Sequence, residues 1–205
     1  MRLVSWNCRG LGNPLKAKVI KDLLKIESPD IIMLQETKIE GKPLLDLSRV
    51  KWKRNAGNVV STRGSSGGIS TVWSNDKFQL ESSFETQHWI YTKLCHSASK
   101  LTFALFNIYV PIHFLEKKEC WKYLIYFIEI YSHVNIIEVR DLKIVLDPKE
   151  KRGVISSREQ MLPLVDDLIQ QWHLLDFKPK KGLYMWTNKI TWEPHISTRL
   201  NRFLL

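Results

Sequence analysis

The stretch RLVSWNCRGLGNPLKAKVIKDLLKI, residues 2–26, shows how this chain is built. It opens with a short apolar run that breaks at Asn7 and Gly10, which is typical of a strand followed by a loop. Asn13 then stands where a helix N-cap is expected, and Pro14 suits the first helical position. The residues that follow recur at helical spacing and predict one apolar face, formed by Leu15, Val19, Ile20, Leu23 and Leu24.

The same interspersion of strands and helices continues along the chain. Helices are expected at 115–131 and from about Pro163 onward. Two β-rich segments separated by the polar HSASK predict a hairpin. We therefore expect an α/β (α+β) fold of mixed sheets packed with helices, in a single domain over residues 1–205. Strands are expected at 2–6, within 28–37 after a turn, and at 68–74, 88–95, 101–109, 134–139, 183–188 and 198–205.

Composition narrows the possible partners. The chain has 205 residues and a net charge of +10, which favours an anionic partner such as nucleic acid; a soluble domain with a merely basic surface is the equal alternative. A hydrophobic content of 44% argues against disorder. Three cysteines without a CxxC pair favour a reduced, intracellular protein. No signal peptide or membrane span is evident, and no stable protein partner is inferred.

Four apolar runs each deliver one polar side chain at or just past their carboxyl end. These residues are Asn7, Glu36, Tyr109 and Asp141. Gathered in one cleft, the two carboxylates would suit Mg²⁺, which usually takes one or two protein carboxylates and keeps several waters. Taken singly, an acid after a strand is more often a turn or cap residue, and Tyr109 before Val110-Pro111 is more often a packing residue. Their shared placement favours a metal-assisted phosphate site.

Seven segments of the sequence resemble, in order, those of the endonuclease/exonuclease/phosphatase superfamily. They are LVSWNCRGLG, SPDIIMLQETK, RGSSGGISTVW, NIYVP, DLKIVLDPKEKRG, LYMWTN and RLNRFLL. The resemblance spans essentially the whole chain and, through LDPKEKRG, is greatest to the endonuclease domain of plant LINE-type (non-LTR) retrotransposons. It implies a four-layer sandwich of two mixed β-sheets flanked by helices. It also implies Mg²⁺-dependent phosphodiester hydrolysis, with Mn²⁺ as a substitute, and DNA as the substrate that is nicked.

The resemblance assigns a role to each of the four residues. Asn7 matches an amide that orients a catalytic acid and helps to hold the metal. Glu36 matches the main metal-binding carboxylate, and Tyr109 a phenol that contacts the scissile phosphate. Asp141 matches the aspartate of a Gly-Asp-Phe/Leu-Asn motif, which positions or activates the attacking water.

Other family positions differ in this chain. The motif asparagine falls on Lys143, and the aspartate that orients a catalytic histidine falls on Asn201. The family's Ser-Asp-His segment lies beyond Leu205, so the domain is expected to be incomplete and to lack terminal strands. None of the six histidines follows RLNRFLL. Strand alternation would point Lys143 to the side of Asp141, where it would repel a metal ion or pair with the carboxylate.

These differences leave three interpretations. The first is a Mg²⁺-dependent DNA endonuclease whose activity is weak or lost, since a missing general acid or base costs ~10²–10⁴-fold in rate. The second is a non-catalytic nucleic-acid-binding module, and the third is a non-functional retrotransposon relic. The superfamily's phosphatase and lipid-hydrolase branches are less favoured. A nuclear location follows only if DNA is the substrate.

Overall fold

The computed structural model describes most of the chain, and its internal contacts divide it into two compact units. Unit 1 comprises Met1–Tyr109 and His133–Val139; unit 2 comprises Val110–Ser132 and Arg140–Leu205. Whether they form the single domain expected from the sequence stays a prediction. The residues outside the description are 40–45, 47–51, 53, 63–66, 132–134, 142, 154–159, 180–181, 183, 185, 189–194 and 205, together with the side chains of 131, 135–141, 186 and 201.

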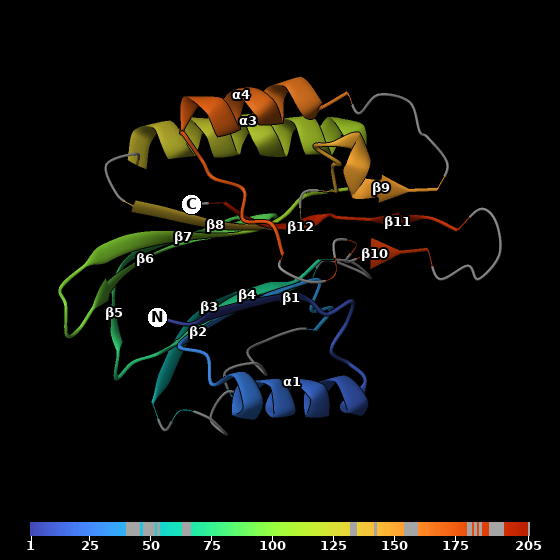
Figure 1. Cartoon of the computed structure of the whole chain (residues 1–205). Coiled ribbons are helices and arrows are strands. Elements are labelled where there is room, and N and C mark those ends of the chain that lie inside the picture. Colours follow the sequence, from blue (N-terminus) through green and yellow to red (C-terminus); the bar gives the residue numbers. More distant parts are fainter. Residues whose placement is uncertain are drawn as a thin grey trace. The chain divides into compact units, whose positions relative to one another are not determined.

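In the part of unit 1 that the structure describes, the helix α1 accompanies most of the long strands (Figure 1). The helix α1 spans Pro14–Glu27, and the Asn13 side chain caps it by accepting a hydrogen bond from the Leu15 amide at 2.9 Å. The cap predicted from the sequence is therefore confirmed. The strands are β1 (Leu3–Asn7), β2 (Ile31–Gln35), β3 (Asn55–Val60), β4 (Ile69–Ser74), β5 (Phe78–Glu85), β6 (Trp89–His96), β7 (Thr102–Tyr109) and β8 (Asn135–Asp141). The last two residues of β8 belong to unit 2.

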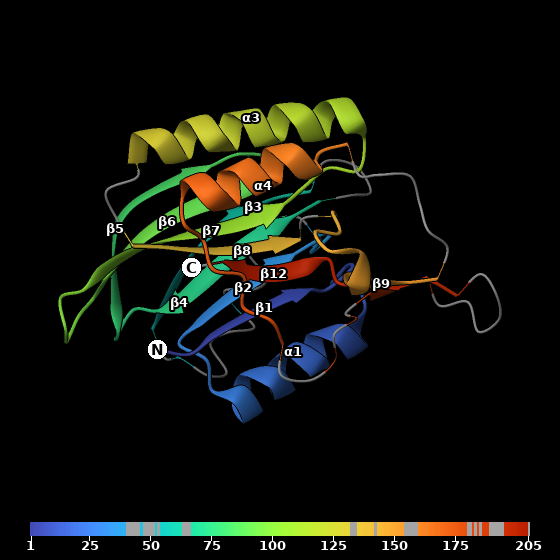
Figure 2. The same ribbon diagram turned by 45° about the horizontal axis from the view of Figure 1, so that its top comes forward.

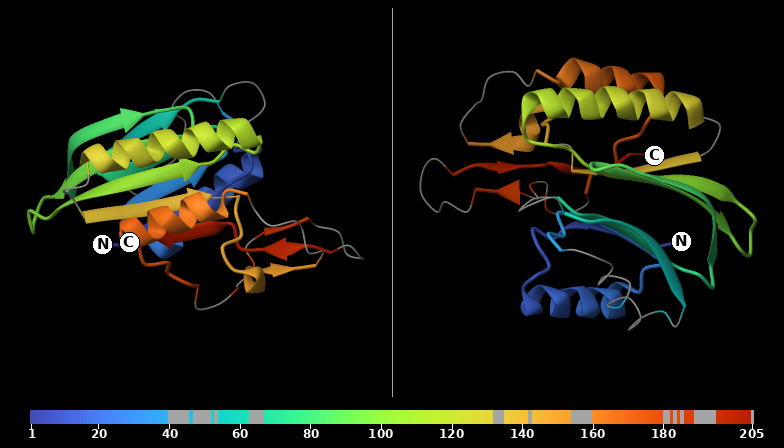
Figure 3. Two further views of the ribbon diagram at one scale, coloured as in Figure 1. Left: turned by 90° about the horizontal axis from the view of Figure 1, so that it is seen from above. Right: turned by 180° about the vertical axis from the view of Figure 1, so that it is seen from behind.

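These strands form two sheets. The first has the order β1-β2-β4-β3, in which β1 and β2 are parallel and the other pairs are antiparallel. In the second, β8, β7, β6 and β5 are successive neighbours, and β6 and β7 form the hairpin expected around HSASK. The two sheets of unit 1 lie against each other, as the views in Figure 3 show. The expected fold class, mixed sheets with helices, is confirmed.

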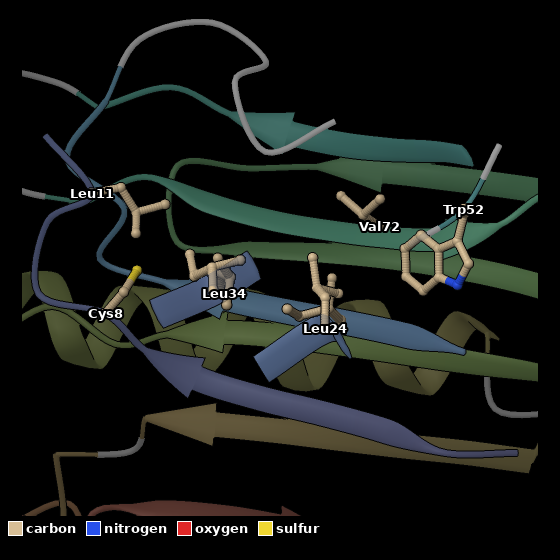
Figure 4. Close-up of a cluster of buried hydrophobic side chains, with 8 residues drawn as sticks. Cys8, Leu11, Leu24, Leu34, Trp52 and Val72 are labelled. Carbon is tan, nitrogen blue, oxygen red and sulfur yellow. The ribbon is translucent and has the colours of Figure 1, made fainter. Parts of the chain in front are cut away.

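One hydrophobic cluster of unit 1 lies between α1 and the first sheet. Ile20 and Leu24 of α1 are fully buried against residues of β2 and β4 (Figure 4). The predicted apolar face is therefore only partly right, because Leu15 and Val19 are 70% and 49% exposed. Ile20 directly follows Val19, so the buried face of α1 runs through Ile20 and Leu24, which are one turn apart, and Leu15 and Val19 lie beside this face.

Unit 2 contains two helices, which lie side by side in every view (Figure 2). The helix α3 covers Phe114–Tyr131, and α4 covers Leu162–Gln171 with Pro163 in its first turn, as predicted. No helix in the described ranges is long and apolar enough to cross a membrane. The shorter elements are a 3₁₀ turn at Pro148–Glu150 and the strands β9 (Lys151–Arg152), β10 (Trp186–Thr187), β11 (Ser197–Thr198) and β12 (Asn201–Leu204).

A buried cluster of four charges joins separate segments of unit 2. Arg199 and Arg202 are each 1% exposed, and Glu150 is 3% exposed. Arg199 donates to Glu150 Oε1 at 2.8 Å and to both carboxylate oxygens of Asp176 at 2.7 Å. Arg202 donates to both oxygens of Glu150 and to Asp176 Oδ2. We name Glu150, Asp176, Arg199 and Arg202 the ion quartet.

The ion quartet makes unit 2 sensitive to acid. Burial raises the pKa of Glu150, but hydrogen bonds from Arg202 and Arg199 outweigh it and lower the pKa from 4.5 to about 2. The pKa of Glu150 is lower in the folded than in the unfolded state, so the ionised carboxylate stabilises the fold above pH 4.5, and this stabilisation is lost as the pH falls toward 2. The contribution to the free energy of unfolding is about 3 kcal/mol. Thermal unfolding from pH 6 to pH 2.5 should show this loss, and Glu150→Gln should flatten the profile in that window.

Candidate functional site

Asn7 and Glu36 lie at neighbouring strand ends in unit 1. Asn7 is the last residue of β1, and Glu36 directly follows the last residue of β2. The two strands are parallel, and Asn7 stands opposite Gln35 in their register. Carboxyl ends of parallel strands meet at one sheet edge, which is where such folds usually present functional groups. The structure therefore brings together these two residues predicted from the sequence.

The loops that follow β1 and β2 are held together by their backbones. The Gly10 amide donates to the Glu36 carbonyl and the Leu11 amide to the Thr37 carbonyl, both at 2.7 Å. The Asn7 side chain accepts a hydrogen bond from the Arg9 amide at 3.1 Å, which orients its carboxamide. Asn7 and Glu36 are thus placed by a paired backbone rather than by independent loops.

Glu36 itself has an unusual backbone. Its φ is 54°, and Arg9 and Lys38 in the same pair of loops have φ values of 48° and 53°. Non-glycine residues rarely adopt this left-handed conformation, and the strain is typical of functional sites. The Glu36 carboxylate is partly exposed and pairs with the Lys38 ammonium at 3.2 Å. A negative group at the sheet edge is therefore available to solvent with one cation beside it.

A close approach of Gly68 fixes the loop after Glu36. The amides of Thr37 and Lys38 donate to the carbonyls of Gly68 and Gly67 at 3.0 and 3.1 Å. A β-carbon on Gly68 would lie 2.2 Å from Thr37 Oγ1 and 3.1 Å from the Lys38 amide nitrogen, and the φ of Gly68 is +84°. Only glycine fits both the space and this backbone conformation.

We therefore expect Gly68→Ala to destabilise unit 1 by about 1–3 kcal/mol, because the new methyl group must displace Thr37 and the backbone becomes strained. Gly12→Ala is the matched control, since nothing lies within 4 Å of a β-carbon there. Urea denaturation of both variants measures the difference. Equal stability of the two variants would contradict the close approach of Gly68 to Thr37.

Tyr109 ends β7 in the second sheet of unit 1 and is 7% exposed. Its amide donates to the His88 carbonyl at 2.8 Å. Its side chain packs in a cluster with Ile69, Ile90 and Val60. Ile69 stands opposite Gln35 in the β2–β4 register, so the Tyr109 ring packs beside the strand end that carries Glu36. Packing is therefore part of the role of Tyr109, as the alternative interpretation expected.

The other predicted positions belong to unit 2. Asp141 is the last residue of β8 and Asn201 is the first of β12, but their side chains lie outside the described residues. Lys143 follows the end of β8 with a φ of 49°, so strand alternation does not extend to it. The expectation that Lys143 points to the same side as Asp141 assumed that the strand continues, and β8 ends at Asp141. The Lys143 carbonyl accepts a hydrogen bond from the buried Lys117 ammonium at 3.4 Å.

Cationic groups accompany the β1 loop. The Lys16 ammonium donates to the carbonyls of Cys8 and Arg9 at 2.9 and 2.7 Å. The Cys8 thiol is buried, and burial raises its pKa to about 12, so it is not a nucleophile at neutral pH. Arg9 has an exposed side chain in the same loop. The cations of this loop therefore suit an anion, and the Glu36 carboxylate suits a metal cation. The Cys8 thiol is not suited to act as a nucleophile here.

Sequence reasoning missed two groups at this site. One is the Lys38 ion pair with Glu36, although Lys38 closes the quoted segment SPDIIMLQETK. The other is a pair of buried amides, Gln35 and Asn107, directly beside the strand ends. Gln35 is the last residue of the otherwise apolar strand β2, and this polar end of a buried strand was the available signal.

Known proteins of similar fold place this arrangement in context. The chain matches the structure of the AP endonuclease LMAP from Leishmania major, with 16% identity and a TM-score of 0.74 over 99% of this chain and 78% of that one. It also matches the endonuclease domain of TRAS1, a telomere-specific non-LTR retrotransposon, with 9% identity, a TM-score of 0.72 and coverages of 99% and 84%. A mannosyl-6-phosphatase from Bacteroides thetaiotaomicron gives 13% identity, a TM-score of 0.69 and coverages of 100% and 84%.

At these identities the likeness shows the fold. The sequence itself matches no curated protein. It does match the model of the endonuclease/exonuclease/phosphatase family over residues 4–182, a range that includes Asn7, Glu36, Tyr109 and Asp141. The chain therefore belongs to the endonuclease/exonuclease/phosphatase family.

Proposed function

We propose that this chain is a metal-dependent phosphodiesterase of the DNA endonuclease type, which nicks DNA by attack of water on a backbone phosphate. The observation that carries the proposal is the placement of Asn7 and Glu36 at adjacent ends of β1 and β2, within a family fold that includes nucleases. Both side chains are oxygen donors, and one is a carboxylate, which is the ligand type that magnesium prefers.

The donor set fits a magnesium ion that keeps most of its water. Among the described residues no three Asp, Glu, His or Cys side chains converge, so a fully protein-lined metal cage is not expected there. Among the described residues, Glu36 supplies a carboxylate and Asn7 supplies an amide oxygen. The Lys38 ammonium lies 3.2 Å from Oε1 of Glu36. When bound, the metal would neutralise charge developing on the phosphate and stabilise the leaving oxygen.

The other residues would act on the phosphate and on water. The Tyr109 phenol would donate a hydrogen bond to a phosphate oxygen, which positions the ester. Asp141 would accept a proton from the attacking water or orient it. Asn7, held by the Arg9 amide, would keep the donor atoms of the site in place. These roles for Tyr109 and Asp141 follow from the family resemblance.

We expect this activity to be weak. Lys143 and Asn201 occupy the positions of the motif asparagine and of the aspartate that orients a histidine. One preorganised donor is worth ~10²–10³-fold in rate, and losses within one catalytic group do not multiply. Lys143 also has a left-handed backbone with φ 49°, a conformation that asparagine adopts more readily than lysine.

DNA is the proposed substrate for two reasons. The net charge of +10 favours a polyanion, and Arg9, Lys16 and Lys38 supply cations in or beside the site loops. Two structures of similar fold are named as an AP endonuclease and a retrotransposon endonuclease domain. The segment LDPKEKRG favours the plant LINE-type branch over the phosphatases and lipid hydrolases, and DNA as substrate would imply a nuclear location.

The test is nicking of supercoiled plasmid by purified, monodisperse protein in Mg²⁺, in Mn²⁺ and in EDTA. We expect slow relaxation of the plasmid with either metal and none with EDTA. Folding is checked by circular dichroism before each assay. A folded chain that leaves the plasmid supercoiled with both metals would overturn the proposal.

A second function, nucleic-acid binding without catalysis, is favoured by the Glu36–Lys38 ion pair. At 3.2 Å the ammonium supplies a positive charge at the carboxylate where the metal is proposed to bind. Such a module would bind DNA with an affinity that falls linearly in log salt, and metal would change neither affinity nor plasmid topology. Fluorescence anisotropy with labelled DNA across a salt series separates it from a chain that neither binds nor cuts.

A further inference from the structure

A pair of buried amides links the two sheets of unit 1. Gln35 of β2 is 1% exposed, and Asn107 of β7 is 0% exposed. The Gln35 Nε2 donates to Asn107 Oδ1 at 2.6 Å, across 72 residues of sequence. We name this contact the amide bridge. Both amides are buried, and a buried polar group is costly unless it is hydrogen-bonded.

Both amides are anchored further, so the bridge has little freedom. The Asn107 Nδ2 donates to the Ser70 carbonyl at 2.9 Å and to Thr71 Oγ1 at 3.2 Å. The Gln35 Nε2 also donates to Ser5 Oγ at 3.1 Å. One side chain of the second sheet thereby reaches β2 and β4 of the first, and β1 is connected through Ser5. Side-chain hydrogen bonds thus connect β7, directly or through Gln35, with three strands of the first sheet.

The bridge lies one or two residues from three of the candidate site residues. Gln35 directly precedes Glu36, and Asn107 is two residues before Tyr109. Ser5 is two residues before Asn7 on β1. Asn7 and Glu36 belong to the first sheet and Tyr109 to the second, so the packing of the two sheets decides how far apart these groups lie.

Apolar packing alone is not directional and tolerates small sliding of one sheet over another, whereas hydrogen bonds with fixed partners do not. We propose that the Gln35–Asn107 bridge is a positioning device that locks the register of the two sheets and so sets the separation between the Glu36 carboxylate and the Tyr109 phenol. Its catalytic consequence rests on the proposed function, but the register lock does not.

Three variants separate positioning from stability. Asn107→Leu and Gln35→Leu each leave a buried amide without its partner, so both should lower the melting temperature. The double variant replaces both amides by apolar groups and should recover much of that loss. Leu94→Val is the matched control, because Leu94 is buried in the same sheet as Asn107 and its side chain has no hydrogen-bonding group. If the bridge had a purely structural role, the position of Tyr109 and the melting temperature would recover together in the double variant.

The position of Tyr109 is read from its fluorine signal after 3-fluorotyrosine incorporation, with Tyr109→Phe as the assignment. Its ring packs against Ile69 and Val60 of the first sheet, so its chemical shift reports the register of the sheets without any metal. We expect a shifted or broadened Tyr109 signal in the double variant although its melting temperature has recovered, and an unchanged signal in Leu94→Val. A native-like Tyr109 signal in the double variant would overturn the register lock.

Nicking rates and the effect of Mn²⁺ on the fluorine signal test whether the amide bridge also affects catalysis. In the native chain, Mn²⁺ held by Glu36 should broaden the Tyr109 fluorine signal, and the double variant should change that broadening. Its kcat should fall by about 10²-fold with KM nearly unchanged, the cost of misplacing reacting groups by ~1 Å. Absence of nicking and of Mn²⁺ broadening in the native chain would count against the proposed function alone, since the metal-free fluorine signal still decides the register lock.

Discussion

Glu36→Gln should reduce Mg²⁺-dependent nicking by at least about 10²-fold while leaving the fold intact. The substitution keeps the size of the side chain and one oxygen donor but removes the negative charge that a divalent cation needs. Glu36 is partly exposed and makes its ion pair at the surface, so little stability depends on it. Nicking rates at saturating Mg²⁺ and melting temperatures measure the two effects separately.

The matched control for this change is Glu27→Gln, an exposed carboxylate at the end of α1 in the same unit. It alters the net charge equally but lies outside the site loops. Binding to DNA should persist in both variants, since each removes a negative charge and leaves every cation in place. Equal nicking by the two variants would show that Glu36 is not the metal-binding carboxylate.

Arg202→Met should destabilise unit 2 by about 3–5 kcal/mol, which lowers its melting temperature by roughly 10 °C. Methionine fills a similar volume, so cavity formation is not the main cause. The loss arises because the buried Glu150 would keep its charge, and Arg199 would have to compensate both Glu150 and the partly exposed Asp176. Removal of one partner from a buried ion pair is costly for this reason, even where the intact pair contributes little.

Arg152→Met is the control, because Arg152 is an exposed arginine on β9 only two residues from Glu150. A surface substitution of this kind is expected to stay within ±0.5 kcal/mol. A second variant, Arg202→Met with Glu150→Gln, removes one charge of each sign and should recover part of the stability. Comparable melting of Arg202→Met and Arg152→Met would mean that the ion quartet is open to solvent.

The fold could be predicted from sequence wherever local pattern and burial agree. The strand β2 is apolar up to its last residue, Gln35, and buried throughout, and α1 has both its cap and its periodic core residues. Two strands of unit 1 were missed because their residues are not apolar. In β5 only Phe78 is buried, and β3 contains Asn55, Gly57 and Asn58, which are unfavourable in strands. Their neighbours in the sheets, not their own residues, make them strands.

The site was predictable as a set of positions but not as a set of contacts. The strand ends that carry Asn7, Glu36 and Tyr109 follow from the break in each apolar run. The amide bridge joins residues far apart in the chain, so no local pattern contains it. For Lys143 a local pattern was applied too far along the chain. Side chains alternate between the two faces only within a strand, and β8 ends two residues before Lys143.

At Glu36 the residue that is best for folding differs from the residue that is needed for the proposed chemistry, because its backbone is left-handed. Glycine adopts a φ of 54° without strain, so a selection for yield of folded protein should enrich Glu36→Gly. A selection for cleavage should retain the carboxylate despite its conformational cost. Sequencing position 36 from the two selections, run on one library, therefore reports which property has shaped this loop, and the two pools should diverge there first.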